Sequence, residues 1–423
     1  MKKKIILFSL IAFATVIQAQ TLEECQSAAK KNYPIIKQYD LIAQTTHLTV
    51  RNIQKGWLPQ VTASALATYQ SDVVAWPESM QNMYQQMGLK MKGLTKDQYK
   101  VGVDLHQTLY DGGAISSQNK IARQEGKVQE AQTEANLYQV RKRVNEMYFS
   151  LLLLDEQIKL NDDVVALLLS SEKKLSAMVK SGTAATSDFE NVKAERLYAA
   201  QQNTSLKAQR LMLQRMLSVF CGIEVSNLRK PDIIKAAAST NNRPELRLFD
   251  NQLQLADTRE KGLDALLRPK LGVFAQGYYG YPGLNMFEDM LSHKWSLNGV
   301  VGVKLTWNVG ALYTRKNDKA KLRLQREMIE NAREVFLFNN NMEQIQQTEN
   351  ISRYHTMMQT DNEIIVLRTN VRKAAESRLT HGIIDTNSLL REINNENAAK
   401  AQQAIHEIDM LKEMYNLQYT NNE

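Results

Sequence analysis

Glycine and proline are almost absent from two long stretches of this chain. The stretch from Ala114 to Ser181 contains one glycine, Gly126, and no proline. The stretch from Ala311 to His381 contains no glycine and no proline. Proline breaks a helix interior and glycine weakens it, so nothing here interrupts a helix of roughly 100 Å at 1.5 Å per residue. The chain is therefore built on two helices much longer than those of globular domains.

Long apolar runs are also lacking. The one candidate is Ile5 to Ile17, which follows three lysines and precedes Ala19. This pattern predicts a secretory signal peptide over residues 1–19, since a spanning helix needs ~20 apolar residues. An exported chain without such a helix belongs in the periplasm, outside the cell or in a bacterial outer membrane. Alternating segments favour the outer membrane, where barrels span the bilayer.

Residues for catalysis or metal binding are sparse. The chain has two cysteines and six histidines, and the histidines stand apart without an HExxH or CxxC motif. A Walker loop, a dinucleotide fingerprint and a GxSxG elbow are also missing. We therefore predict no catalytic site, no cofactor and no metal, and the chain is not expected to be an enzyme. Whether Cys25 and Cys221 form a disulfide stays open, because two distant cysteines do not decide it.

Charge and methionine are the two features that suggest other ligands. The formal net charge is +8, but the basic residues alternate with acidic ones along the helices, which indicates solvated faces and no nucleic-acid partner. Met80, Met83, Met87 and Met91 recur three and four residues apart. Such a stripe suits either a copper or silver relay or, more often, simple packing.

The first long helical stretch carries a seven-residue seam, which is typical of a coiled coil. Polar residues surround the seam, so the helix needs partner helices in water. The seam consists of Leu137, Val140, Val144, Met147, Leu151, Leu154 and Ile158.

Four segments alternate apolar and polar residues with the period of a half-buried strand. We predict strands at residues 60–70, 99–110, 270–281 and 295–309. In the second and fourth segments the apolar residues, such as Val103 and Val303, share one face of the strand. We therefore expect Asp104 and Lys304 to point to the opposite face, into a barrel lumen. A charged side chain facing lipid at mid-depth would cost ~2–4 kcal/mol.

The whole pattern occurs twice. Val301, Gly302, Val303 and Leu305 repeat Val101, Gly102, Val103 and Leu105, and the turn at Gly382 repeats the turn at Gly182. The chain is thus a tandem duplication. We predict a first repeat at residues 20–221, a linker at 222–242 and a second repeat at 243–423. The first repeat is expected to begin with one helix from Leu22 to Lys55, followed by two strands and a long helical hairpin.

These residues resemble the TolC family of outer-membrane efflux channels. The likeness rests on Leu22-Glu23-Glu24, on Asn32-Tyr33-Pro34, on the junction Leu109-Tyr110-Asp111-Gly112-Gly113 and on its second copy, Leu305 to Gly310. The ordered duplication, covering the mature chain, is its most specific part. The fold that this implies is mainly α-helical with a β-barrel membrane part. Three chains form one 12-stranded barrel in outer-membrane lipid, continued by a coiled-coil tunnel across the periplasm.

The resemblance also implies partners and a docking site. A homotrimer would act as a passive export duct that docks onto a periplasmic adaptor (membrane fusion) protein and an inner-membrane pump of the RND or ABC type. The docking residues would lie at the two helical tips: Gly182, Thr183, Ala184, Ala185, Asp188, Gly382, Ile383 and Ile384. The alternative function is a periplasmic or secreted coiled-coil scaffold or adhesin without channel activity.

The acidic residues at the tunnel entrance depart from the family pattern. In the family an aspartate lies six residues after each turn glycine. Asp188 matches this in the first repeat, whereas the second has Ser388 there and Arg391 three residues later. Asp385, together with Asp188, is therefore the candidate for an acidic ring at the entrance.

Overall fold

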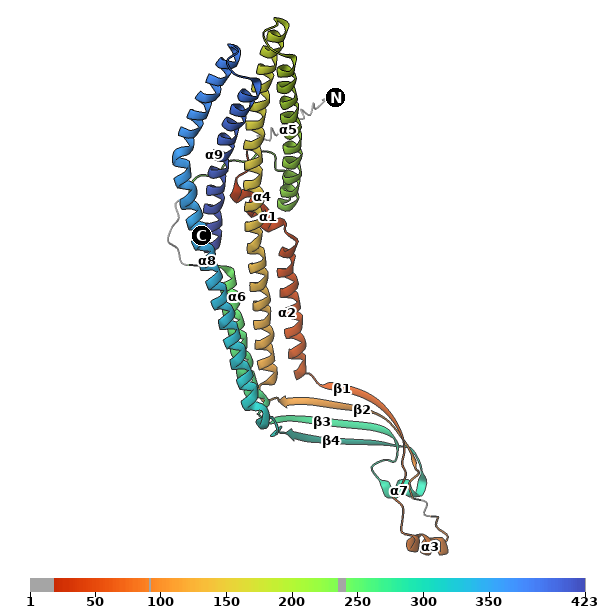
Figure 1. Cartoon of the computed structure of the whole chain (residues 1–423). Helices are drawn as coiled ribbons and strands as arrows, with labels where there is room; N and C mark the ends of the chain where they lie inside the picture. Colours follow the sequence, from red (N-terminus) through yellow and green to blue (C-terminus); the bar gives the residue numbers. More distant parts are fainter. Residues whose placement is uncertain (1–18, 91–92, 235–240, 423) are drawn as a thin grey trace, which may run out of the picture. The chain divides into compact units, whose positions relative to one another are not determined.

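The computed structural model describes residues 19–90, 93–234 and 241–422. Residues 1–18 of the predicted signal peptide, Met91 and residues 235–240 of the predicted linker lie outside these ranges. The helices and strands follow the predicted order (Figure 1). The long helices are α4 (Ala114–Lys180) and α8 (Ala311–Thr380), and each is followed by a return helix, α5 (Thr186–Cys221) or α9 (Thr386–Asn421). No helix among the described residues is both long and apolar enough to cross a membrane.

Two compact units divide the chain, and each takes segments from both sequence repeats. One comprises residues 40–130 and 248–332, which we call the strand unit. The other comprises the described residues of 19–39, 131–247 and 333–422, which we call the hairpin unit. Each repeat therefore contributes strands to one unit and a helical hairpin to the other.

The strand unit contains one antiparallel sheet in the order β1-β2-β3-β4, which leaves β1 and β4 as free edges (Figure 1). The strands are β1 (Gln60–Tyr69), β2 (Asp97–Tyr110), β3 (Lys270–Tyr281) and β4 (Ser296–Thr306). The last strand ends three residues before the predicted Val309. Trp307 lies just beyond it, and its indole Nε1 donates to the carbonyl of Leu267 at 2.9 Å.

The two faces of this sheet differ in polarity, because residues paired across strands project to the same side. One row reads Val61, Leu105, Ala275, Val301, and the adjacent row reads Thr62, Asp104, Gln276, Val300. On the apolar face Val101, Val103, Val301 and Val303 are exposed. An aromatic group lies at one end of this face, where Tyr99 stacks on Trp295 with ring centroids 6.2 Å apart.

The two connections between strands pack on each other. They carry α3 (Glu78–Gln86) and α7 (Met286–Ser292). Leu94, Tyr281 and Met290 form a small core that Trp76 covers. Met80, Met83 and Met87 are exposed, so the methionine stripe does not pack within the described chain. No group of histidine, cysteine, aspartate or glutamate suited to a metal occurs among the described residues.

The strand unit also contains helices, which adjoin the ends of the strands. These are α2 (Gln38–Gln54), the first turns of α4, α6 (Pro244–Leu266) and the first turns of α8. Small residues allow close packing: a Cβ at Gly126 would lie 2.5 Å from the hydroxyl of Thr46 on α2.

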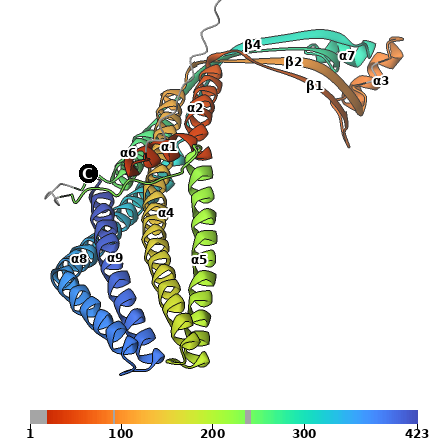
Figure 2. The same ribbon diagram turned by 90° about the horizontal axis from the view of Figure 1, so that it is seen from above.

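The hairpin unit pairs α4 with α5 and α8 with α9, as both views show (Figures 1 and 2). The predicted coiled-coil seam on α4 is buried at Leu137, Val140, Val144, Leu151 and Leu154. Most of these residues join the N-terminal helix α1 (Leu22–Asn32) and the ends of α5 and α9 in the largest core. The core thus forms around the middle of α4, where the seam predicts partner helices.

One prediction is wrong at the N-terminus, where the sequence suggests a single helix from Leu22 to Lys55 and no proline inside a long helix. The structure ends α1 at Asn32 and resumes with a 3₁₀ turn, Pro34–Lys37, before α2. Tyr33 is extended, with φ −63° and ψ 126°. The cause is the ring of Pro34, which disfavours helical backbone at the residue before it.

Candidate functional site

The two helical tips are built by the same backbone motif. Gly182 and Gly382 adopt left-handed φ values of 76° and 70°, which glycine tolerates without strain. The amide of Thr183 donates to the carbonyl of Met178 at 2.8 Å, and the amide of Ile383 donates to that of Arg378 at 2.9 Å. These are the bonds of a Schellman C-cap, so each long helix ends at its glycine and the chain reverses.

The tip side chains divide into exposed and packed groups. Ala184 and Ile384 pack against a core of Leu168, Leu175, Val192, Ala375, Leu389 and Ile393, which the two hairpins share. Ile383, by contrast, is 70% exposed. Gly182, Thr183, Ala185 and Gly382 are also exposed. The exposed residues are the ones that a partner could contact, whereas Ala184 and Ile384 hold the tips together.

The acidic candidates at the tips have different environments. Asp385 is the N-cap of α9, and its carboxylate accepts a hydrogen bond from the amide of Ser388 at 2.9 Å. This bonding to Ser388 lowers the pKa of Asp385. The first repeat has Ala185 as N-cap without a side-chain bond, and Asp188 lies half-buried in the first turn of α5. No ion pair or hydrogen bond connects Asp188 with Asp385 among the described residues.

Charged side chains near the tips connect the two hairpins, a feature that the sequence pattern does not reveal. Lys174 on α4 reaches Glu376 on α8, with Nζ and Oε1 2.5 Å apart. Glu376 also accepts from Arg372 at 3.1 Å, and Arg372 bonds to Glu396 of α9. The ion pairs therefore run from the first hairpin through both helices of the second.

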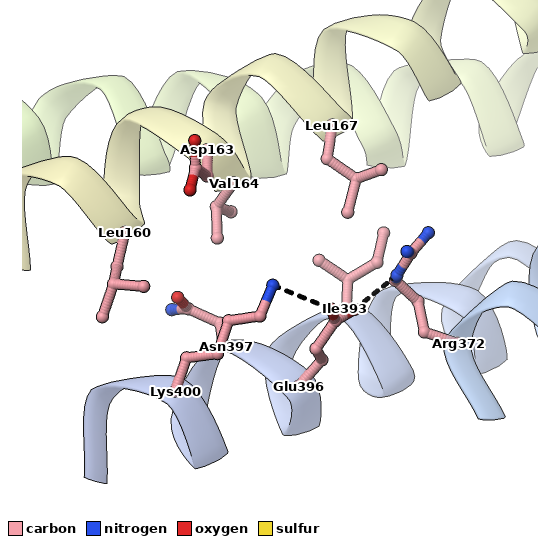
Figure 3. Close-up of a pocket in the computed structure, with 9 residues that line it drawn as sticks. All are labelled: Leu160, Asp163, Val164, Leu167, Arg372, Ile393, Glu396, Asn397 and Lys400. Carbon is pink, nitrogen blue, oxygen red and sulfur yellow. Dashed lines mark hydrogen bonds and ion pairs between the residues drawn. The ribbon is translucent and has the colours of Figure 1, made fainter. Parts of the chain in front are cut away.

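A small cavity of about 220 Å³ lies beside this network (Figure 3). Apolar side chains of α4 line one wall, including Leu160 and Leu167, and the polar residues of α8 and α9 face them. Burial would raise the pKa of Glu396, but hydrogen bonds from Lys400, Thr369 and Arg372 lower it instead. The carboxylate is thus held charged between the helices.

The two predicted lumen residues lie on the polar face of the sheet. Asp104 accepts a hydrogen bond from the amide of Gln276 at 2.8 Å. Asp104 is level with Val300, whereas Lys304 pairs with Gly272, so the two charges do not face each other across the sheet. The register places both residues on the face opposite Val103 and Val303 and sets the offset between the charges, and their position in a lumen stays a prediction.

The comparisons with known proteins address the fold and the family. Residues 27–219 match the family model described as outer membrane efflux protein. A comparison with curated protein sequences finds no match.

Solved structures with a similar fold are outer-membrane channels. The outer-membrane channel OprN is 14% identical with a TM-score of 0.69, over 94% of this chain and 89% of OprN. The CmeC outer membrane channel of Campylobacter jejuni is 12% identical with a TM-score of 0.67, over 94% of this chain and 85% of CmeC. The MtrE outer membrane channel of Neisseria gonorrhoeae is 14% identical with a TM-score of 0.66, over 94% of this chain and 88% of MtrE.

The family match in the first repeat, the second repeat of the same pattern and a fold shared along nearly the whole chain lead to one assignment. Residues 27–219 thus match the outer membrane efflux protein family, and the chain has the fold of TolC-like outer-membrane channels along nearly its whole length.

Proposed function

We propose that three copies of this chain form a passive export duct. The observation that supports this most is the sheet: four strands with free edges β1 and β4, one exposed apolar face and one polar face. An open edge is not tolerated in lipid, and four strands cannot close a barrel. Three sheets joined edge to edge would give a 12-stranded barrel with its polar face, including Asp104 and Lys304, toward the lumen.

The helical tips are the docking site in this proposal. They would contact the helical ends of a periplasmic adaptor, and an inner-membrane pump of the RND or ABC type would supply the energy. Support comes from the exposed side chains at both tips, such as Ile383, and from the absence of long charged side chains between Gly182 and Ala185 or between Gly382 and Ile384. The acidic ring of Asp188 and Asp385 would then lie near the tunnel entrance.

Surface labelling of intact cells tests the arrangement across the membrane. A cysteine in place of Gln85 on α3 should react with a membrane-impermeant maleimide, because both strand connections would lie outside the cell. A cysteine in place of Ala185 should react only after the outer membrane is permeabilised. The opposite labelling pattern would contradict the topology.

Membrane fractionation tests the alternative function. The channel should remain in the outer-membrane fraction and migrate as a heat-sensitive trimer on gels. A secreted or periplasmic scaffold or adhesin would instead be released with the soluble proteins and show no heat-modifiable band. Conductance in planar bilayers then separates a duct from a closed trimer.

A further inference from the structure

A basic groove runs between α4 and α6 where these helices meet the sheet. It encloses about 680 Å³. The groove begins at Gly112 and Gly113, between the end of β2 and the start of α4, and it includes the last turns of α6. Its cationic side chains are Lys120, Arg123, Lys127, Lys261 and Arg268. The sequence suggests dispersed charge, but packing gathers cations from two segments far apart in the chain.

The acidic side chains of α6 face another helix. They form ion pairs with basic residues of α8, so they do not neutralise the groove. The pairs are Asp257 with Arg326 at 3.3 Å, Glu260 with Lys319 at 4.0 Å, and Asp264 with Arg315 at 2.7 Å. Beside the groove the carboxylates of α6 therefore point toward α8, whereas elsewhere on α6 Arg247 and Arg259 pair with Glu134 and Glu125 of α4 at 3.0 and 2.7 Å.

The cations of the groove have no carboxylate within 4 Å in the part of the chain that the structure describes. The one carboxylate lining the groove is Asp264. The hydrogen bond from Arg315 lowers the pKa of Asp264, and Lys319 and Arg268 act in the same direction. Asp264 is thus already committed to other cations. Arg268 shares Asp264 with Arg315 and Lys319, and the other four groove cations have no ion pair among the described residues. Positive charges gathered around one cavity repel each other, and an anion in the groove would relieve that repulsion.

Hydroxyl groups complete the lining. Ser116, Ser117 and Thr258 lie among the cations. Several ammonium and guanidinium donors together with hydroxyl donors match a phosphate group, whose oxygens accept multiple charge-assisted hydrogen bonds. We propose that this groove binds a phosphate-bearing anion.

The position of the groove suggests two sources for the phosphate. In the proposed barrel, on which this step rests, the groove lies at the periplasmic end of the strands, where lipid headgroups meet water. It also lies between the helices that adjoin the middle strands β2 and β3, away from the edges that would join neighbouring copies. The phosphate could belong to an anionic lipid headgroup or to a soluble anion. Both would use the same five cations.

Binding to the detergent-solubilised full-length protein tests the proposal. Native mass spectrometry would measure retention of phosphatidylglycerol, with the zwitterionic phosphatidylcholine as reference, and equilibrium dialysis would measure inorganic phosphate. The groove variant is Arg123→Gln with Lys261→Gln. The control variant, Lys30→Gln with Lys31→Gln, removes two exposed charges from α1.

We expect the groove variant to bind whichever probe the unmodified protein retains, phosphatidylglycerol or inorganic phosphate, about tenfold more weakly, which corresponds to ~1.4 kcal/mol. The control variant should bind that probe as the unmodified protein does. Selective retention of phosphatidylglycerol alone would assign the groove to lipid, and binding of inorganic phosphate would assign it to soluble anions. Equal binding by all three proteins, or no binding of either probe, would overturn the proposal. Trimer content measured on the same samples shows separately whether the proposed assembly fails.

Discussion

Lys174 on α4 and Glu376 on α8 form an ion pair, with Nζ and Oε1 2.5 Å apart, that joins the two helical hairpins near their tips. In each hairpin the long helix and its return helix share a core, but between hairpins the ion pairs add a link that solvent can reach. In the proposed tunnel, an opening motion that separates α4 from α8 would have to break this pair.

The first prediction concerns this link. Glu376→Gln should lower stability by only ~0.2–1 kcal/mol, since the pair is partly exposed, yet it should increase the open fraction of the channel in planar bilayers. The control is Glu343→Gln, which removes the 3.9 Å pair with Lys142, another α4–α8 contact. If the two variants have the same open fraction, the ion pair between Lys174 and Glu376 does not restrict opening.

The second prediction separates docking from stability at the second tip. Ile383→Glu should leave the amount of trimer unchanged and abolish export, because Ile383 is exposed and would meet the adaptor. Ile384→Glu should reduce the amount of folded protein, because Ile384 packs on the core shared by the hairpins. Export is measured as the ability of each variant to restore drug and dye resistance to a strain that lacks the gene for this protein. Full export by the Ile383 variant would contradict docking through this tip.

The sequence predicts the elements of this fold well, because glycine, proline and apolar periodicity are local signals. The absence of proline allows the length of α4. Gly182 marks the point where the chain reverses after α4, and Gly382 marks the same point after α8. The same logic overlooks the break at Tyr33, where Pro34 follows an apparently continuous helical pattern.

The side-chain networks could not be predicted, because they depend on which helix faces which. Lys174 and Glu376 are about 200 residues apart in the sequence. Many other acidic and basic residues have a similar separation, so the sequence does not single out this pair. The basic groove likewise depends on α6 turning its carboxylates toward α8. For the tips, the sequence identifies the glycines but does not show that Ile384 is packed while its neighbour Ile383 is exposed.

The third prediction concerns pH. Because hydrogen bonds lower the pKa of Glu396, its contribution to stability is present above the unfolded value near 4.3 and is lost as pH falls through the folded value. Glu396→Gln should cost about 1–3 kcal/mol at neutral pH, since Arg372 and Lys400 lose their charge-assisted hydrogen bonds to this buried carboxylate. The variant should also lose less stability than the unmodified protein between about pH 5 and 3. Parallel stability curves for the two proteins would contradict a charged Glu396.

The fourth prediction tests the two faces of the sheet. Val103→Lys places a charge on the apolar face and should impair assembly by ~2–4 kcal/mol if that face meets lipid. Asp104→Lys places the same side chain on the polar face, one residue away, and should assemble normally while changing the ion selectivity of the channel. Heat-modifiable trimer on gels measures assembly. Equal assembly of both variants would contradict the face assignment.

The fifth prediction concerns the two cysteines. Cys25 on α1 and Cys221 at the end of α5 are both buried in one core, and the Cys221 thiol donates to the carbonyl of Cys25 at 3.4 Å. The neighbouring Cys221 thiol and burial raise the pKa of Cys25, so the folded thiol should react slowly with alkylating reagents. Burial of both thiols in one core favours oxidation during export, before the core closes, by exchange with an oxidised protein disulfide.

We expect the exported protein to carry this disulfide, which would close a loop of nearly 200 residues and stabilise the native state by about 5 kcal/mol in the chain-entropy model. Denatured but unreduced protein should then resist alkylation and migrate faster on a gel than the reduced form. Cys25→Ser should abolish the mobility difference and lower the unfolding temperature, and Cys221→Ser should do the same. If both thiols of the unmodified protein are alkylated after denaturation without reductant, the cysteines are packing residues only.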